Sequence, residues 1–407
     1  MKFHPCQLYV ITAIFVAILA SCTYESTVYI SNEEFWEGTD GLLFSFLDNN
    51  PPEIVYENMP FNIAFDLENL GAHTATAYMT ISIEDDYMCI LDDNNDCSLF
   101  NPSSQLPASV QNQFAEYDAA IKEYQTQLKT ATDSDQITQL NKQIQTAQKN
   151  KQRLQSLIAI ENPYKTKLFS LEGKSIFNYQ GGSDVISYNA QAKTAGSMSE
   201  THDIQIIATA CYEYVTEWNQ EVCIDTDINK MNIFPGACEA KDISLNSQGA
   251  PLAITEIETK MLPTGTGYIR PMFIIHVQNS GNGRIINKEK TQHACTATGI
   301  ESKDYNMVFL NEFMLSSEQL KYDFNGYDIN TGKELNPGAD GDTISCSPNP
   351  LILKNDGNDY ITCIVNEDAA EDDMLSLNQA PYVTELSLLF EYGYTESQTK
   401  EVTIKRI

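Results

Sequence analysis

The chain has 407 residues, of which 42% are hydrophobic and 20% charged, and its formal net charge is −31. Such an acidic composition argues against nucleic-acid binding and against attachment to anionic lipid headgroups, because both depend on clustered Lys and Arg. The 10 Cys and 21 Tyr favour a β-rich protein outside the cytoplasm.

The first residues predict export. Residues 8–20 are apolar and uncharged, and they are shorter than the roughly 20 residues that span a bilayer. We therefore expect a signal peptide over residues 1–21. Residues 19–22 read LASC, which resembles the lipobox of prokaryotic lipoproteins and predicts a lipid on the Cys22 thiol. A tether over 22–35 then follows. The alternative is an uncleaved N-terminal anchor with an incidental Cys22, and both place the bulk of the protein at the cell surface, outside the membrane.

Two pairs of segments indicate an internal duplication. Residues 61–71 and 272–281 alternate in hydrophobicity and end in Asn-x-Gly, which predicts a strand followed by a tight turn. Residues 212–224 and 392–404 both begin with Tyr-x-Tyr and share Glu-Val-x-Ile near the end. Each of these predicts a β-hairpin. Because both matches occur in the same order, we expect two related domains.

The remaining short alternating runs, separated by Gly, Pro, Asn and Asp, predict a mainly β protein. We expect two Ig-like antiparallel β-sandwich domains, at 36–229 and 253–407, joined by a linker at 230–252.

A helical insertion interrupts the first domain at about 105–165. Residues 114–131 and 137–158 keep heptad spacing on either side of a polar break, which predicts a coiled-coil hairpin. The alternative is a pair of helices that pack on a sandwich face. The segment 114–158 carries six basic and five acidic side chains, so it is nearly neutral in a strongly acidic chain. We therefore expect this arm to contact a protein partner or a second copy.

The cysteines of the mature chain predict disulfides, because their number is even and the chain is exported. They are Cys89, Cys97, Cys211, Cys223, Cys238, Cys295, Cys346 and Cys363. Proximity in sequence pairs Cys89 with Cys97, Cys211 with Cys223, and Cys346 with Cys363, and elimination then pairs Cys238 with Cys295. A zinc site is disfavoured because no C-x-x-C is present and the histidines are scattered.

The residues 51–57 (PPEIVYE), the strand–Asn-x-Gly motifs that end at Gly71 and Gly281, and the Tyr-x-Tyr segments resemble one known family. It comprises secreted archaeal lipoproteins with tandem Ig-like domains similar to the CARDB, or cell-adhesion-related, type. The resemblance implies a cell-surface position and an adhesive or assembly role. It implies no catalytic residue, and the helical insertion is not part of the basic pattern.

The sequence contains no nucleophile elbow, H-E-x-x-H or P-loop, and we predict neither an enzyme nor a required cofactor. Calcium is the best candidate ion, because oxygen ligands alternate in one loop at Asp323, Asn325, Asp328 and Asn330. Residues 92–96 and 356–359 are similarly rich in Asp and Asn. Plain β-turns are the alternative for all three loops.

These observations predict a non-enzymatic, lipid-anchored surface protein that acts in adhesion or envelope assembly through its β-sandwiches and coiled-coil arm. The alternative is a surface substrate-binding protein or a hydrolase that uses acidic residues.

Overall fold

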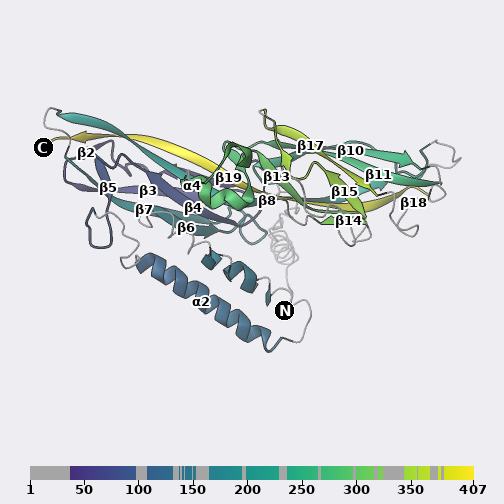
Figure 1. Ribbon diagram of the computed structural model, residues 1–407, viewed down its shortest axis with the longest axis horizontal. Helices are drawn as coiled ribbons and strands as arrows, with labels where there is room; N and C mark the ends of the chain where they lie inside the picture. The colour runs from purple at the N-terminus through teal and green to yellow at the C-terminus, as the bar shows by residue number, and fades with distance from the viewer. Residues whose placement is uncertain are drawn as a thin grey trace, which may run out of the picture. The chain divides into compact units, whose positions relative to one another are not determined.

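Alternating buried and exposed residues place most of the described chain in antiparallel strands, as Figure 1 shows. The computed structural model describes residues 37–97, 108–131, 137, 140–141, 143–148, 150–152, 165–194, 199–228, 236–264, 267–296, 299–315, 320–323, 343–354, 356–366, 375–376 and 380–407. The predicted signal peptide, Cys22 and the whole of the predicted tether lie outside these residues. The mainly β, antiparallel character expected from the sequence is confirmed.

The described strands form three sheets. The four-stranded sheet has the order β1 (Leu42–Phe46), β3 (Pro60–Asn69), β7 (Ser183–Ala192) and β5 (Met88–Ile90). The six-stranded sheet has the order β15 (Ile344–Ser347), β17 (Asn358–Val365), β11 (Tyr268–Asn279), β10 (Leu252–Pro263) and β9 (Ile243–Ser244), with β18 (Leu375–Ser376) beside β11.

The nine-stranded sheet joins both halves of the sequence. Its main path is β14 (Leu320–Asp323), β13 (Met307–Leu315), β19 (Tyr382–Lys405), β8 (Thr201–Ile224), β4 (Ala75–Ser82) and β6 (Thr166–Leu171). The short strands β2 (Ile54–Tyr56) and β12 (Arg284–Ile286) pair with β19, and β16 (Leu351–Ile352) pairs with β13. Only β2 pairs in parallel among the described strands.

The two predicted hairpins at 212–224 and 392–404 are wrong. Each segment belongs to one uninterrupted strand, and β8 and β19 pair with each other antiparallel from Tyr382↔Ile224 to Lys405↔Thr201. Residues 215–220 contain neither Gly nor Pro, and alternate side chains there, including Thr216 and Trp218, are buried. The backbone of this polar stretch therefore bonds to β19 instead of turning.

The long pair β8–β19 contributes to two β-sandwiches. The four-stranded sheet packs on the part of the large sheet that contains β4, since the Tyr188 hydroxyl donates to the Met79 carbonyl at 3.0 Å. The six-stranded sheet packs on the part that contains β13, where the rings of Phe273 and Phe313 lie 5.6 Å apart. The expected domains 36–229 and 253–407 therefore share their central strands, and residues 35–407 form one compact unit.

Four tyrosines of the Tyr-x-Tyr motifs lie in the core where β8 and β19 pair. Tyr212 accepts a hydrogen bond from Leu42 N at 3.1 Å, and Tyr392 accepts one from Leu252 N at 3.2 Å. Tyr214 accepts from His73 N at 3.2 Å and Tyr394 accepts from Gly283 N at 2.6 Å. The first two bonds hold the starts of β1 and β10, and the last two fix the turns that follow β3 and β11. Gly71 is required in the first turn, because a Cβ there would overlap the Tyr214 hydroxyl.

The eight predicted cysteines form four disulfides, which indicates an oxidising, extracytoplasmic environment. The predicted pairs Cys89–Cys97 and Cys346–Cys363 are confirmed. The other two predicted pairs are wrong: Cys211 bonds to Cys295 and Cys223 bonds to Cys238. The error follows from the hairpin error, because Cys211 and Cys223 lie at different points along one extended strand and cannot approach each other.

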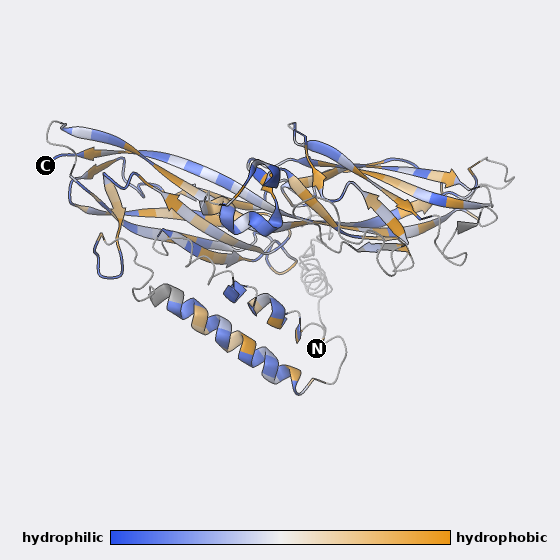
Figure 2. Ribbon diagram, viewed as in Figure 1, coloured by the Kyte–Doolittle hydropathy of each residue, from blue (hydrophilic) through white to orange (hydrophobic). Residues whose placement is uncertain are grey.

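The helical insertion contains α2 (Ala108–Leu128), and residues 143–148 and 150–152 are also helical. Lys151 pairs with Asp118 of α2 at 2.5 Å, so the two helical segments touch. However, Phe114 and Tyr117 pack on a cluster with Tyr78 and Leu168, and Gln113 Nε2 donates to Leu168 O at 2.9 Å. Part of the apolar stripe thus covers the sheet, as the alternative expected. In Figure 2, hydrophobic and hydrophilic residues follow one another along α2.

The other described helices are short: η2 (Lys288–Lys290), α4 (Thr291–Thr296) and η3 (Ser302–Asp304). None of the helices in the described part of the chain has the length and apolar character needed to cross a membrane.

Candidate functional site

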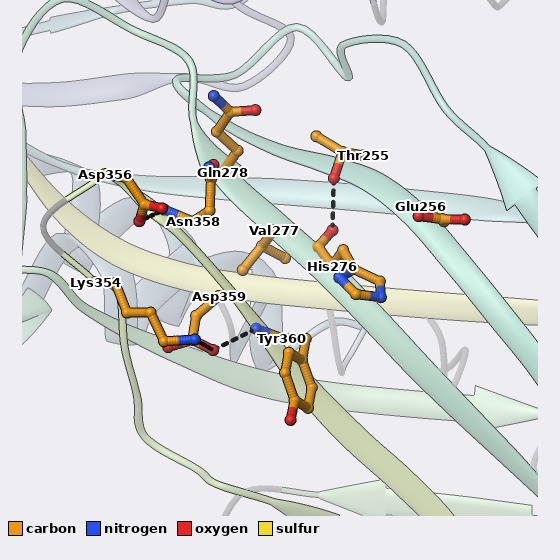
Figure 3. A pocket seen from close by; sticks show the side chains of 10 residues that line it. All are labelled: Thr255, Glu256, His276, Val277, Gln278, Lys354, Asp356, Asn358, Asp359 and Tyr360. Atoms are coloured by element: carbon orange, nitrogen blue, oxygen red, sulfur yellow. Dashed lines mark hydrogen bonds and ion pairs between the residues drawn. The ribbon is translucent and has the colours of Figure 1, made fainter.

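A hollow of about 330 Å³ lies on the outer face of the six-stranded sheet, over β10, β11 and β17 (Figure 3). The inner face of the same strands packs into the sandwich core, for example through Ile257, Ile275 and Ile361. Because side chains alternate across a strand, the outward residues between these core positions share one surface. Polar and aromatic side chains gather there.

The centre of the hollow is one row of side chains across three strands. Glu256 of β10 is the register partner of His276 on β11, and His276 is the register partner of Tyr360 on β17. The next row pairs Gln278 with Asn358. Neighbours in register lie within about 4.5–5.5 Å between Cβ atoms, so these groups can act on one ligand together.

A β-bulge adds a further side chain to this row. The register between β10 and β11 shifts between Ile254 and Glu256, which leaves Thr255 as the extra residue. Thr255 and Glu256 both line the hollow, although successive residues of a regular strand point to opposite faces. The Thr255 hydroxyl donates to the His276 carbonyl at 3.4 Å, which holds the bulge against β11.

His276 is fixed by a carboxylate. Its Nε2 lies 2.9 Å from Glu258 Oε1, and Lys260 Nζ lies 2.6 Å from the other oxygen of Glu258. Hydrogen bonds from Lys260 and then from His276 lower the pKa of Glu258, so this group is a carboxylate at neutral pH. A carboxylate only accepts, so Nε2 of the imidazole carries a hydrogen and donates it.

Tyr360 supplies an accessible ring beside the imidazole. The two ring centroids are 5.6 Å apart and the planes are inclined by 45°, while 46% of Tyr360 is exposed. Lys354 Nζ lies 5.8 Å from the Tyr360 centroid and 3.2 Å from Asp359 Oδ1. The hollow therefore already holds one ammonium group, which belongs to the protein itself.

The loop before β17 is a plain turn. Gly357, with φ of 79°, donates from its N to Lys354 O at 2.9 Å, and Asn358 N donates to Asp356 Oδ1 at 3.2 Å. Asn279 N donates to Gly357 O at 3.0 Å, which seats this turn at the end of β11. The Asp356 carboxylate thus serves the turn, as expected of β-turn chemistry.

The loop at 92–96 is also a turn, since Asp92 Oδ1 accepts from Asn94 N and from Asp96 N at 2.9 Å. Within the described residues, no group of three or more His, Cys, Asp or Glu side chains is placed to hold a metal ion.

The calcium candidates of the third loop are not brought together in the described residues. Asp323 ends β14, whereas Asn325, Asp328 and Asn330 lie outside the described part of the chain. Calcium at that loop stays a prediction.

Sequence reasoning missed the hollow. Its lining residues come from three separate segments, 255–256, 276–278 and 354–360. These segments are close together only because β10, β11 and β17 are neighbours in the sheet. The available signal was a strand with an outward Tyr in the alternating run 358–365, next to the turn at 356–359.

No protein-family model and no curated protein matches this chain. Around the hollow the residues offer a partly exposed ring, an imidazole held in place by Glu258, two amides, a hydroxyl and several carboxylates, which together suit reversible recognition of a polar ligand.

Proposed function

We propose that this protein is a non-enzymatic, lipid-anchored binding protein of the cell surface, which acts in adhesion or envelope assembly. In this proposal it is a member of the archaeal lipoproteins with Ig-like, CARDB-type domains, and the lipid on Cys22 holds it to the membrane. The hollow over β10, β11 and β17 is its contact site.

The row Glu256–His276–Tyr360 carries the proposal. His276 is held by Glu258, and the Thr255 hydroxyl is bonded to the backbone of the neighbouring strand. Such groups are arranged to hold a partner in place. Pre-set side chains on a rigid sheet lower the entropy lost on binding.

The frame behind the hollow supports this role. The ladder of β8 with β19 runs through both sandwiches, and the disulfide Cys211–Cys295 links β8 to α4. A continuous ladder joins the hollow's sandwich to the other sandwich, so a contact at the hollow is made on a rigid frame.

The arm at 114–158 is proposed as a second contact, for a protein partner or for self-association. Phe114 and Tyr117 are engaged with the sheet, so the residues available to a partner are those on the opposite side of α2. Asp118 is held by Lys151. Deletion of 110–160 would then leave the sandwiches folded and abolish self-association in sedimentation experiments. Unchanged association after the deletion would contradict this part of the proposal.

The alternative of a surface substrate-binding protein uses the same hollow, since a soluble ligand can occupy it as readily as a ligand fixed in the envelope. The two functions differ in where the ligand resides, and the attachment experiment separates them.

The experiment uses beads that carry the full-length protein, incubated with cell envelopes of the source organism. We expect attachment by the wild type and its loss in Tyr360→Ala. Tyr56→Ala is the matched control, because Tyr56 is 47% exposed on β2, close to the 46% of Tyr360.

Separately, Cys22→Ala should move the protein from the membrane fraction to the soluble fraction. Equal attachment of both tyrosine variants and the wild type, or membrane retention of the Cys22 variant, would refute the proposal.

A further inference from the structure

We propose that the hollow over β10, β11 and β17 binds a neutral oligosaccharide, with one pyranose ring stacked on Tyr360. The inference rests on the proposed function, because it names the ligand class of the same site.

The size of the hollow suits a small ligand. Its volume of about 330 Å³ is near the lower end of ligand pockets, which run from roughly 300 to 1,000 Å³. The hollow is partly open to solvent, so a chain of sugars can extend beyond it.

The partly exposed ring of Tyr360 provides the apolar contact. An aromatic face carries negative charge and its edge positive charge, so C–H groups with partial positive charge favour the face. A pyranose presents several such C–H groups on one side, with hydroxyls around its edge. Stacking on Tyr360 would therefore turn those hydroxyls toward the neighbouring polar residues.

The polar residues match hydroxyls in kind. In the described part of the chain, the side chains of Glu256, Gln278 and Asn358 make no hydrogen bond to protein, and all three line the hollow (Figure 3). Each amide both donates and accepts, as each hydroxyl does, and the carboxylate accepts from two hydroxyls at once. Gln278 and Asn358 are register partners, so their amides form a pair beside the ring.

Charge selects against other polar ligands. Glu256, Asp356 and Asp359 line the hollow against a single Lys354, so phosphate, sulfate and uronate groups are repelled. A cationic ligand is repelled by the Lys354 ammonium, which lies 5.8 Å from the Tyr360 centroid and already pairs with Asp359. A neutral, polyhydroxylated ligand meets no charge repulsion, and the Lys354 side chain, which is 65% exposed, can turn into solvent when a pyranose stacks on the ring.

The test measures binding of defined probes to the full-length protein by calorimetry. The probes are cellotetraose, mannotetraose, galactotetraose and chitotetraose, with sorbitol as an acyclic polyol, spermidine as a cation and a sulfated tetrasaccharide as an anion. We expect at least one neutral oligosaccharide to bind, and sorbitol, spermidine and the sulfated probe not to bind.

The variants separate stacking from general surface effects. Tyr360→Ala should weaken the binding at least about tenfold. Tyr360→Phe, which keeps the ring, and Tyr56→Ala, the matched exposed tyrosine, should bind as the wild type does. Gln278→Ala should weaken binding by several-fold. Melting temperatures equal to that of the wild type establish that each variant is folded.

Three results would overturn the inference: no neutral oligosaccharide binds, Tyr360→Ala binds as the wild type does, or spermidine or the sulfated probe binds more tightly than every neutral probe. If bead attachment depends on Tyr360 but no oligosaccharide binds, the sugar is excluded as the ligand and the proposed function is retained. If neither bead attachment nor oligosaccharide binding depends on Tyr360, both proposals are refuted.

Two further binding experiments distinguish the possible sources of the sugar. Retention of the protein on deproteinised envelope polysaccharide assigns the ligand to a polysaccharide, and retention only on the glycoprotein fraction assigns it to protein-linked glycans. Each result supports a saccharide ligand. Retention by neither fraction counts against it.

Discussion

Glu213 on β8 lies directly opposite Gly393 on β19. These two residues hold the same place in the two sequence repeats, since Tyr212 corresponds to Tyr392 and Tyr214 to Tyr394. Residues equivalent in the repeats therefore pair across one ladder, with Tyr212 opposite Tyr394 and Tyr214 opposite Tyr392. This is the reciprocal arrangement of an isologous, two-fold interface, formed here within a single chain.

The hydrogen bonds of the four hydroxyls repeat in the same way. The first tyrosine of each motif accepts from a strand amide, Leu42 N or Leu252 N, and the second accepts from a turn amide, His73 N or Gly283 N. The duplication seen in the sequence is thus preserved in the contacts at the centre of the fold.

Removal of one of these hydroxyls should destabilise the protein. Tyr392→Phe leaves Leu252 N without its acceptor and removes one of the two partners of the Thr216 hydroxyl, which keeps its bond to Leu252 O. We expect a loss of about 1–3 kcal/mol in the free energy of unfolding, measured by chemical denaturation. Tyr56→Phe, on an exposed ring, is the control and should change little. A Tyr392→Phe variant as stable as this control would show that the buried hydroxyl contributes nothing.

The disulfides should differ in their effect on stability. Cys211–Cys295 closes a separation of 84 residues, whereas Cys89–Cys97 closes one of 8. Because the entropy removed from the unfolded chain grows with loop length, the double variant Cys211→Ser, Cys295→Ser should lose roughly 2–4 kcal/mol. The double variant of Cys89 and Cys97 should lose less. Thermal denaturation compares the two.

Peptide mapping without reduction tests the pairing directly. We expect linked peptides that contain Cys211 with Cys295 and Cys223 with Cys238. A peptide that links Cys211 to Cys223 would restore the pairing predicted from sequence proximity and would exclude the long β8 strand at that point.

The equivalent asparagines of the two repeats provide a matched comparison. Asn69 is fully buried; its Nδ2 donates to the carbonyls of His73 and Leu171, and its Oδ1 accepts from Gly71 N. Asn279 makes the corresponding bond to Gly283 O and is partly exposed. Asn69→Ala should therefore cost about 2–3 kcal/mol and Asn279→Ala about 1 kcal/mol in denaturant unfolding. The reverse order would be inconsistent with these bonds.

High pH should unfold the protein through its buried tyrosines. Burial raises the pKa of Tyr188, Tyr212, Tyr214 and Tyr392 above the ordinary value of about 10. A folded-state pKa above the unfolded value gives stability that is complete below about pH 10 and is lost as pH rises toward the folded value. Phenolate absorbance should rise in two steps, the second together with unfolding. Ionisation of every tyrosine before any loss of structure would contradict this.

The hydrophobic alternation and the turn residues were sufficient to predict the mainly β, antiparallel character and the repeat, because period two in 61–69 and 272–279 is a property of neighbouring residues. The even number of cysteines predicted the oxidising compartment, because it depends on composition and not on which segments pair. Local evidence also predicted the disulfides whose partners lie close together, Cys89–Cys97 and Cys346–Cys363.

Pairing between distant segments was decided only by the tertiary structure. The run 215–220 is polar and was predicted to be a turn, yet it is a strand because β19 satisfies its backbone groups over its whole length. Because β8 pairs with β19 along its whole length, Cys211 forms its disulfide with Cys295, and the two expected domains share their central strands. Strand pairing is also why the hollow was invisible in the sequence, since Glu256, His276 and Tyr360 become neighbours only when β10, β11 and β17 hydrogen-bond in that register.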